Sequence, residues 1–260
     1  MSQRIVRYER DGTTSYGLLD GDDRIAPLPG DPYGVLSPSG DTAPLSDVTL
    51  LCPVPAPRIF GVGLNYVSHA QEMNLPQPKV PMLFMKPTTA AIGPGEPIPY
   101  PPEAKNLHFE AEVAVVIGKR GRRVSEAEAM ELVLGYTCGN DVSERVIQRA
   151  EMDQGCLLIG KGYDGFNPLG PTIATGLDPG DIGLIGRVNG EERQRNNTGD
   201  LIYSIPALIA YMSQAMTLLP GDIIMTGTPA GVGPIVAGDT VEIEIDGAGV
   251  LSNPVVAEAV

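Results

Sequence analysis

Short apolar segments, each ended by glycine, proline, asparagine or aspartate, limit most strongly what this chain can fold into. Six such segments follow residue 80: PMLFMK, EVAVVIG, DIGLIGRVNG, DIIMTG, TVEIEID and VLSNPVV. Apolar runs of this length between turn residues are typical of strands. The 32 Gly and 25 Pro are spread over the whole chain, which fits strands and turns better than disorder. We therefore predict an α+β protein that consists mainly of strands.

Helices are expected at few places. Ser125 and Glu128 have the spacing of a capping box before the segment AEAMELVLG. Ser204 can cap the segment IPALIAYMSQAM, because Pro206 is tolerated in the first turn of a helix.

The first 55 residues are expected to form a small β domain of their own. The strand-like segments RIVRYER, TTSYGLL and RIAPL are separated by the turn sequences DG and DGDD. The stretch DPYGVLSPSGDTAPLSD then follows, and its many Pro, Gly, Ser and Asp residues are typical of a linker. We place the boundary near Ala56, which gives an N-terminal domain of residues 1–55 and a catalytic domain of residues 56–260.

The acidic charge balance narrows the range of partners. The chain has 32 acidic and 18 basic residues, and this formal charge of -14 leaves no cationic surplus to displace counterions from nucleic acid. No stretch approaches the roughly 20 apolar residues that cross a bilayer, and the first residues contain no apolar signal core. We expect a cytoplasmic protein with neither a nucleic-acid nor a membrane partner.

Cysteine and histidine are too few for the common soft metal sites. Cys52, Cys138 and Cys156 are odd in number and form no CxxC pair, so we expect reduced and mostly buried thiols. His69 and His108 are the two histidines of the chain. A metal ion would therefore have to be held mainly by oxygen.

Two carboxylates lie close together in the segment NLHFEAEVAVVIGKR. Glu110 and Glu112 are two residues apart at the start of an apolar strand, so their side chains point to the same side of a sheet. Their mutual repulsion is relieved by a proton or by a hard divalent cation. Asp141, which follows LGYTCGN, is a candidate third ligand. A solvent-facing strand edge for the glutamates and a helix cap for Asp141 remain open on spacing alone.

His69 and Glu72 are three residues apart in NYVSHAQEMN. On a short helix the two side chains share a face, and the carboxylate can orient the imidazole as a general base for work near pH 7. A surface pair without a function is the alternative. The segment LPQPKVP at residues 75–81 suggests a mobile lid that would bring the base to the substrate.

Several cationic and glycine-rich positions are candidates for anion binding. Lys161 lies between two glycines in GKGYDG, and Lys86 and Arg145 are further candidates, although each alone fits a structural cation. In MTGTPAGVG, Gly227 offers a backbone amide and Thr228 a hydroxyl to a negatively charged oxygen. Neither a phosphate-loop pattern nor a GxGxxG pattern is present, which disfavours nucleotides and NAD.

Taken together, the segments between about Arg58 and Pro254 resemble the fumarylacetoacetate hydrolase family, in particular its acylpyruvase-like branch. Six ordered blocks carry the resemblance: GVGLNYVSHAQEM, FMKPTTAAIGPG, FEAEVAVVIG, GYTCGNDVSERVIQ, GKGYDGFNPLGP and TLLPGDIIMTGTPAGVGP. Six blocks in family order are far more specific than any one of them.

The resemblance implies a mixed β-roll or sandwich core with few helices, a small extra N-terminal domain and a homodimer. It implies Mg²⁺ (or Mn²⁺) at Glu110, Glu112 and Asp141, and catalytic roles for His69, Glu72 and Lys161. We assign the expected contacts to a small 2-oxo acid substrate to five residues: Lys86, Arg145, Gln148, Gly227 and Thr228. The chain departs from the family pattern at Leu64, where relatives carry Arg or Lys, and at Cys156 and Leu157, so the identity of the substrate is open.

The expected reaction is hydrolysis of a C-C bond in an acylpyruvate-like 2,4-dioxo acid. In this hypothesis a Lewis-acidic metal stabilises the pyruvate enolate and His69 activates the attacking water. Decarboxylation of oxaloacetate, or isomerisation of 2-hydroxyhepta-2,4-diene-1,7-dioate, at the same site is the alternative. A catalytically silent protein that binds a 2-oxo acid is the alternative from another class.

Overall fold

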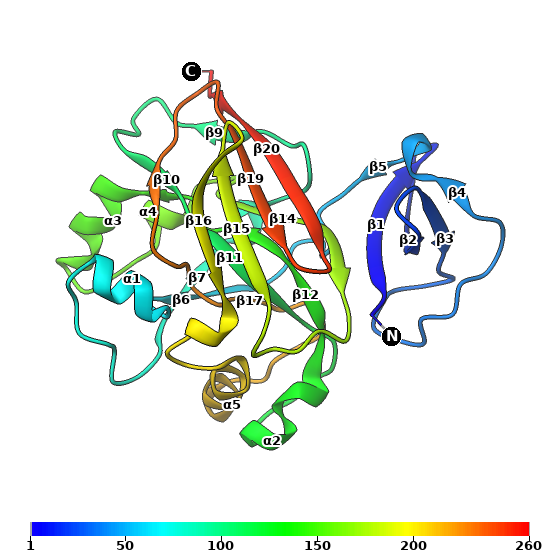
Figure 1. Cartoon of the computed structure of the whole chain (residues 1–260), viewed down its shortest axis with the longest axis horizontal. Coiled ribbons are helices and arrows are strands. Elements are labelled where there is room, and N and C mark those ends of the chain that lie inside the picture. Colours follow the sequence, from blue (N-terminus) through cyan, green and yellow to red (C-terminus); the bar gives the residue numbers. More distant parts are fainter. Residues whose placement is uncertain (1, 260) are drawn as a thin grey trace.

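The protein consists of two lobes of unequal size, which Figure 1 shows side by side. The computed structural model describes residues 2–259. The smaller lobe contains the first five strands: β1 (Arg4–Arg10), β2 (Thr13–Asp20), β3 (Arg24–Pro27), β4 (Ala43–Pro44) and β5 (Thr49–Leu50). Each of its first three strands matches a segment that the sequence predicted.

A 12-stranded sheet runs from the small lobe into the large one. Its central path is β4-β3-β2-β1-β14-β12-β11-β17-β6-β7, and β5 and β8 pair beside it. The strands that the large lobe contributes are β6 (Ile59–Gly63), β7 (Met82–Lys86), β8 (Ala91–Ile92), β11 (Ala111–Ile117), β12 (Val133–Asn140), β14 (Asn167–Ala174) and β17 (Ile223–Met225). Only two residue pairs, Arg4 with Ala174 and Ile5 with Ile173, join β1 to β14.

Two smaller sheets complete the large lobe. The five-stranded sheet has the order β16-β15-β19-β20-β9, with β9 (Ile98–Tyr100), β15 (Gly183–Val188), β16 (Glu191–Asn197), β19 (Thr240–Ile245) and β20 (Gly249–Ala257). The three-stranded sheet joins β10 (Leu107–Phe109), β13 (Ser143–Glu144) and β18 (Gly233–Pro234). The mixed, mainly β fold with few helices is therefore confirmed.

The helices are short and lie at the periphery of the large lobe: α1 (Val67–Glu72), α2 (Glu126–Ala129), α3 (Arg145–Met152), α4 (Ile159–Gly162) and α5 (Ile205–Ala215). The described part of the chain also contains four 3₁₀ turns: η1 (Leu45–Asp47), η2 (Thr88–Ala90), η3 (Met130–Leu132) and η4 (Thr198–Asp200). Ser204 caps α5 and the capping box of Ser125 is present. The helix expected in AEAMELVLG ends early, because Val133 already pairs with Ile117 in the sheet.

The strand β11 is buried on both faces, and this burial fixes its register. Val113, Val115 and Ile117 face the main core, together with apolar residues of β15 and β19. Ala114 and Val116 face a second cluster, which also contains Ile5 and Leu18 of the small lobe. The small lobe therefore packs against the sheet through shared apolar side chains as well as the β1–β14 pairing. A separate domain of residues 1–55 stays a prediction.

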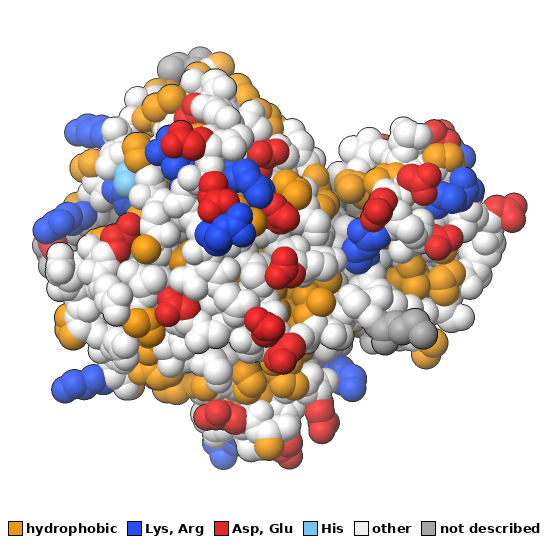
Figure 2. Space-filling model, in the orientation of Figure 1, with side chains coloured by type: hydrophobic (Ala, Val, Ile, Leu, Met, Phe, Trp, Pro, Cys, Tyr) orange, Lys and Arg blue, Asp and Glu red, His pale blue; other side chains and the backbone are white. Residues whose placement is uncertain are grey.

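The surface carries both signs of charge. Figure 2 shows acidic side chains over both lobes with Lys and Arg side chains between them, and it shows no continuous basic patch on this face. Among residues 2–259, no helix is both long and apolar enough to cross a membrane.

Candidate metal centre and proton-transfer pair

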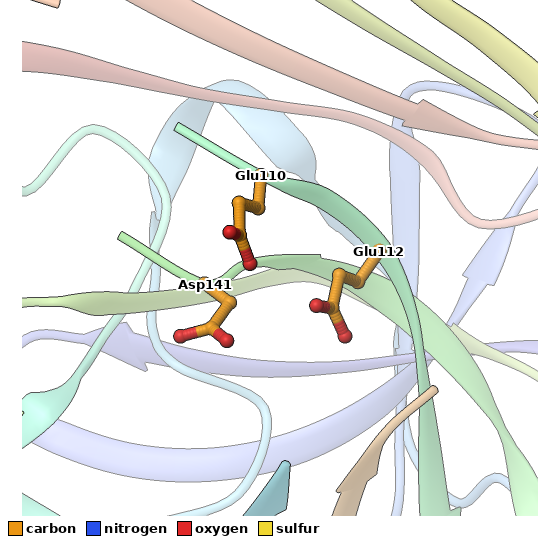
Figure 3. A group of neighbouring side chains, drawn as sticks. All are labelled: Glu110, Glu112 and Asp141. Atoms are coloured by element: carbon orange, nitrogen blue, oxygen red, sulfur yellow. The ribbon is translucent and has the colours of Figure 1, made fainter. Parts of the chain in front are cut away.

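Three buried carboxylates converge where two neighbouring strands meet. Glu110 and Glu112 flank Ala111, the first residue of β11, and Asp141 directly follows β12. Because Ala111 pairs with Asn140, the register brings the three side chains together. One carboxylate oxygen of each lies within 4.8 Å of the others, and Figure 3 shows all three carboxylates pointing into a common space. The sequence prediction that these residues come together agrees with this geometry.

Two of the three carboxylates have cationic partners. Lys161 Nζ lies 3.0 Å from Glu110 Oε2 and 2.6 Å from Asp141 Oδ2, and it also donates to Ser143 Oγ at 2.8 Å. Lys86 Nζ contacts the other oxygen of Asp141. Arg145 Nη2 lies 2.6 Å from Glu110 Oε1. The two lysines, which were candidates for substrate contact, therefore hold Asp141 in place.

These neighbours affect the pKa values of the two glutamates in opposite directions. Burial alone would raise the pKa of Glu110, but Lys161 and Arg145 outweigh it and lower the pKa to about 2. The pKa of Glu112 is raised well above its ordinary value, first by burial and then by the negative charges of Asp141 and Glu110. The repulsion between the carboxylates is therefore not compensated at Glu112.

The donor set fits a hard divalent cation. All three ligand residues offer oxygen and are buried, with at most 5 % of each residue exposed. Among the described residues, Glu112 forms no ion pair, and its Oε2 accepts a hydrogen bond from Gly227 N at 2.8 Å. A cation between the three carboxylates would relieve the repulsion that raises the pKa of Glu112. The site could therefore hold a divalent metal ion.

His69 and Glu72 form a hydrogen-bonded pair on α1. His69 Nδ1 lies 2.9 Å from Glu72 Oε2, and Glu72 Oε1 accepts from Gly231 N at 2.9 Å. Because Nδ1 is bonded to the carboxylate, Nε2 is the ring nitrogen left for a substrate. The His69 residue is 9 % exposed, so the imidazole lies largely inside the protein. The pair thus has the hydrogen bond that orients an imidazole, and the role of His69 as a general base stays a prediction.

The segment that follows α1 is exposed and makes a hydrogen bond to the large lobe. Leu75 and Val80 are at least half exposed, and Tyr203 Oη donates to Pro78 O at 2.7 Å. At the other end of α1, Ser68 N donates to Asp200 Oδ2 at 3.1 Å. These contacts hold α1 and the segment against the large lobe. Movement of the segment as a lid stays a prediction.

Three other candidate substrate residues already have protein partners. The Gly227 amide donates to Glu112, and the Thr228 hydroxyl donates to Ala111 O at 2.9 Å. Gln148 Oε1 accepts from Arg145 Nη1 at 2.8 Å. The turn that the sequence suggested as a cradle for a substrate anion thus supports the carboxylate cluster in this structure, and substrate contact by these groups stays a prediction.

The helix cap that the sequence left open at Asp141 is excluded, and two of the three thiols are buried, in line with the expectation of mostly buried thiols. Asp141 does not cap a helix: α3 begins at Arg145, and Glu144 is its cap because its side chain accepts from Ile147 N. Cys156 is exposed, whereas Cys52 and Cys138 are buried as expected. Leu64, one of the departures from the family pattern, adopts a positive φ of 52° immediately before the Asn-Tyr pair.

The sequence analysis overlooked Gln194, which is 1 % exposed. Its Nε2 donates to Thr228 Oγ1 at 2.7 Å and its Oε1 accepts from Ala111 N at 2.8 Å. The only sequence signal is that its strand, EERQRNN, contains no apolar residue. Such a strand gives no periodicity from which a buried position could be chosen.

Comparison with known proteins shows which sequences this chain is similar to. The family model "Fumarylacetoacetate (FAA) hydrolase C-terminal" matches residues 58–256, and the model "Rv2993c-like, N-terminal" matches residues 3–53. Protein Rv2993c of Mycobacterium tuberculosis is 48% identical over 228 residues, which cover 86% of this chain and 85% of that protein. The mitochondrial oxaloacetate tautomerase fahd2 of Xenopus laevis is 44% identical over 222 residues, which cover 81% and 69% of the two chains.

Solved structures share the fold. The crystal structure of 2-hydroxyhepta-2,4-diene-1,7-dioate isomerase from Mycobacterium marinum superposes with a TM-score of 0.91 at 40% identity, covering 99% of this chain and 100% of that one. Fumarylpyruvate hydrolase from Pseudomonas aeruginosa, in complex with Mn²⁺ and pyruvate, gives a TM-score of 0.75 at 35% identity and covers 81% and 92%.

Proposed function

We propose that this chain, which belongs to the fumarylacetoacetate hydrolase family, is a divalent-metal-dependent enzyme that interconverts the enol and keto forms of a small 2-oxo acid. One observation carries the proposal: Glu112 is buried between two further carboxylates and forms no ion pair among the described residues. Mg²⁺ or Mn²⁺ bound there would supply a Lewis acid that stabilises negative charge on the 2-oxo oxygen. The name of the Xenopus relative favours tautomerisation over the C-C hydrolysis expected from the sequence.

Residues of the chain would supply the base, the group that orients it and the cations that bind the acid group of the substrate. In the proposed reaction His69 Nε2 removes a proton from the carbon next to the keto group, the electron pair of that C-H bond forms the C=C bond, and the C=O π pair moves to the keto oxygen. The imidazolium then returns the proton to that oxygen to give the enol, and the reverse sequence gives the keto form. Glu72 holds the imidazole through Nδ1 and stabilises the imidazolium that forms. Lys161 and Arg145 lie at the carboxylate cluster and would neutralise the acid group of the substrate.

Hydrolysis of an acylpyruvate is the second candidate, because the His69–Glu72 pair is equally suited to removing a proton from water. The Pseudomonas neighbour, a fumarylpyruvate hydrolase solved with Mn²⁺ and pyruvate, supports this candidate. Decarboxylation of oxaloacetate needs an electron sink and no base, so it is the least demanding of the three reactions.

A panel of substrates tests the proposal. The purified protein, with Mn²⁺ or Mg²⁺ added, is assayed for enol loss from oxaloacetate and from 2-hydroxyhepta-2,4-diene-1,7-dioate. Acetylpyruvate and fumarylpyruvate report hydrolysis, and CO₂ release reports decarboxylation. We expect the enol–keto reaction to be fastest and to stop with EDTA. Fast pyruvate release from an acylpyruvate would favour hydrolysis instead, and inactivity on all substrates despite metal binding would favour the silent binding protein.

We also propose that the protein forms a homodimer through exposed apolar side chains. Residues 73–85 carry five of the large exposed apolar side chains and residues 146–159 carry four. Figure 1 shows α1 and α3, which lie next to or within these segments, on the same side of the large lobe. Contiguous exposed apolar patches mark association sites, and in this proposal the two segments form one such patch. Light scattering after size exclusion should give twice the chain mass, and Ile159→Asp should give a monomer; a wild-type monomer at all concentrations would contradict the proposal.

A further inference from the structure

Strand β16 buries one side chain fully, and that side chain is polar. Its sequence EERQRNN contains no apolar residue, and of its seven side chains only that of Gln194 is buried. Burying a primary amide is costly unless its hydrogen bonds are made inside the protein. Beyond the pairing of β16 with β15, this buried amide therefore needs hydrogen-bond partners inside the large lobe.

The local backbone makes room for Gln194 and directs it inward. Gln194 pairs with Gly186, and the register then shifts so that Arg187 pairs with Glu192, which leaves Arg193 as the extra residue of a β-bulge. A Cβ at position 186 would lie 3.0 Å from Ala111 Cβ and 3.2 Å from Gln194 Oε1. Glycine at position 186 thus allows the amide to reach the start of β11.

Gln194 binds the backbone at Ala111, between the two glutamates of the candidate metal centre. Its Oε1 accepts from Ala111 N, and its Nε2 donates to Thr228 Oγ1 and to Pro229 O at 2.9 Å. Thr228 in turn donates to Ala111 O. Because a backbone N–H can only donate and a carbonyl can only accept, these partners fix the orientation of the amide.

No strand could supply these bonds at Ala111. Strand β17 pairs with β11 from Ala114 to Val116 and ends at Met225, so the N–H and C=O of Ala111 lie beyond its end. The peptide group that joins Glu110 to Ala111 is held from both sides, since Glu110 O accepts from Asp141 N at 3.0 Å and Ala111 N donates to Gln194. One peptide group thus connects Gln194 with two of the three carboxylate residues.

We infer that Gln194, acting with Thr228, is a positioning residue that sets the spacing of Glu110, Glu112 and Asp141 for the metal ion. The inference rests on the proposed function and adds to it a residue of another sheet. The amide of this residue makes its hydrogen bonds to Ala111, Thr228 and Pro229. Losing such an outer hydrogen-bond partner costs a metal site roughly 10–100-fold in affinity.

Mn²⁺ binding tests the inference without an activity assay. Mn²⁺ is titrated into the full-length protein and followed by electron paramagnetic resonance, for the wild type and for Gln194→Met, Thr228→Val and the double variant. Gln194→Met keeps the volume of the side chain and removes all three hydrogen bonds. We expect each single variant to bind Mn²⁺ about 10–100-fold more weakly. We also expect the double variant to lose less than the product of the two single losses, because both substitutions break one network.

The matched control is Arg195→Ala, which changes the exposed neighbour of Gln194 on the same strand. It should bind Mn²⁺ within twofold of the wild type. If Gln194→Met does not fold, by circular dichroism, Thr228→Val decides the question alone. Unchanged Mn²⁺ affinity and an unchanged bound-Mn²⁺ spectrum in the folded variants would overturn the inference, even if their melting temperatures fall. If the wild type itself binds no Mn²⁺, the proposed metal centre fails and this inference fails with it.

Discussion

The carboxylate cluster and the His69–Glu72 pair are held by the protein in different ways. The carboxylates lie at the ends of β11 and β12, inside the large lobe, and Asp141 alone contacts two buried lysines. The imidazole lies on α1, a helix of six residues followed by an exposed segment. The first region is fixed by the sheets and the second by a few hydrogen bonds to loops.

This difference matches what each region has to do in the proposed reaction. A metal site needs ligand atoms at fixed distances, and strand ends supply them. A group that transfers a proton can be carried on an element that moves with the substrate. The following predictions test whether the two regions are separable, beginning with the largest expected effect.

Glu112→Ala should remove metal binding. The substitution deletes a ligand, so the loss of Mn²⁺ affinity should exceed the roughly 10–100-fold cost of losing an outer partner, and activity should be lost with it. Isothermal titration with Mn²⁺ measures the effect, with the exposed Glu131→Gln as the control. Stoichiometric binding of full affinity in Glu112→Ala would rule out the assignment of this ligand.

His69→Ala should separate the two regions. Loss of a general base lowers kcat by about 10²–10⁴. Because the carboxylates are held by other segments, Mn²⁺ affinity should stay within about threefold of the wild type. Stopped-flow assays of enol loss, together with Mn²⁺ titration of the same variant, give both numbers. A large loss of Mn²⁺ affinity would show that the two regions are not independent.

Mn²⁺ should raise the melting temperature. A ligand at about 100 times its Kd stabilises the folded state by about 2.7 kcal/mol, which for a chain of this size corresponds to about 5–10 °C. Scanning calorimetry with Mn²⁺ and with EDTA measures the shift. Glu112→Ala should show no shift, and an equal shift in that variant would place the stabilising ion elsewhere.

The metal-free protein should become less stable as the pH rises above the ordinary pKa of a glutamate. The folded-state pKa of Glu112 is raised, so the folded protein binds its proton more tightly than the unfolded chain does. That contribution is fully present below the unfolded pKa and is lost as the pH increases through the folded pKa. Urea unfolding with EDTA across this pH range should show a decline in the free energy of unfolding, and Glu112→Gln should reduce that decline. An identical pH profile in the variant would contradict a buried, uncompensated carboxylate at this position.

Tyr203→Phe should have the smallest effect. It removes the hydrogen bond to Pro78 O and leaves the ring in place, so the segment 73–82 should become more mobile. The net contribution of a hydrogen bond to stability is about 1 kcal/mol, so we expect no more than a few-fold change in KM and no change in Mn²⁺ affinity. Hydrogen exchange should increase in residues 73–82 alone; increased exchange in β11 as well would couple the two regions.

The sequence predicted the parts of the molecule that local pattern determines. Glu110 and Glu112 flank one residue at the start of an apolar strand, so their common direction follows from the period of two in a strand. The start of α2 was predicted, but its early end could not be, because pairing of Val133 with Ile117 outweighs helix propensity at that point. The role of Gln194 depends on contacts between separate sheets, which a strand without apolar residues does not reveal.

The most direct test of the account is a crystal structure of the protein grown with Mn²⁺ and measured near the manganese absorption edge. The account predicts one anomalous peak within bonding distance of carboxylate oxygens of Glu110, Glu112 and Asp141. A map in which the ion is bound elsewhere, or in which Lys161 still bridges Glu110 and Asp141 with no manganese beside them at saturating Mn²⁺, would contradict it.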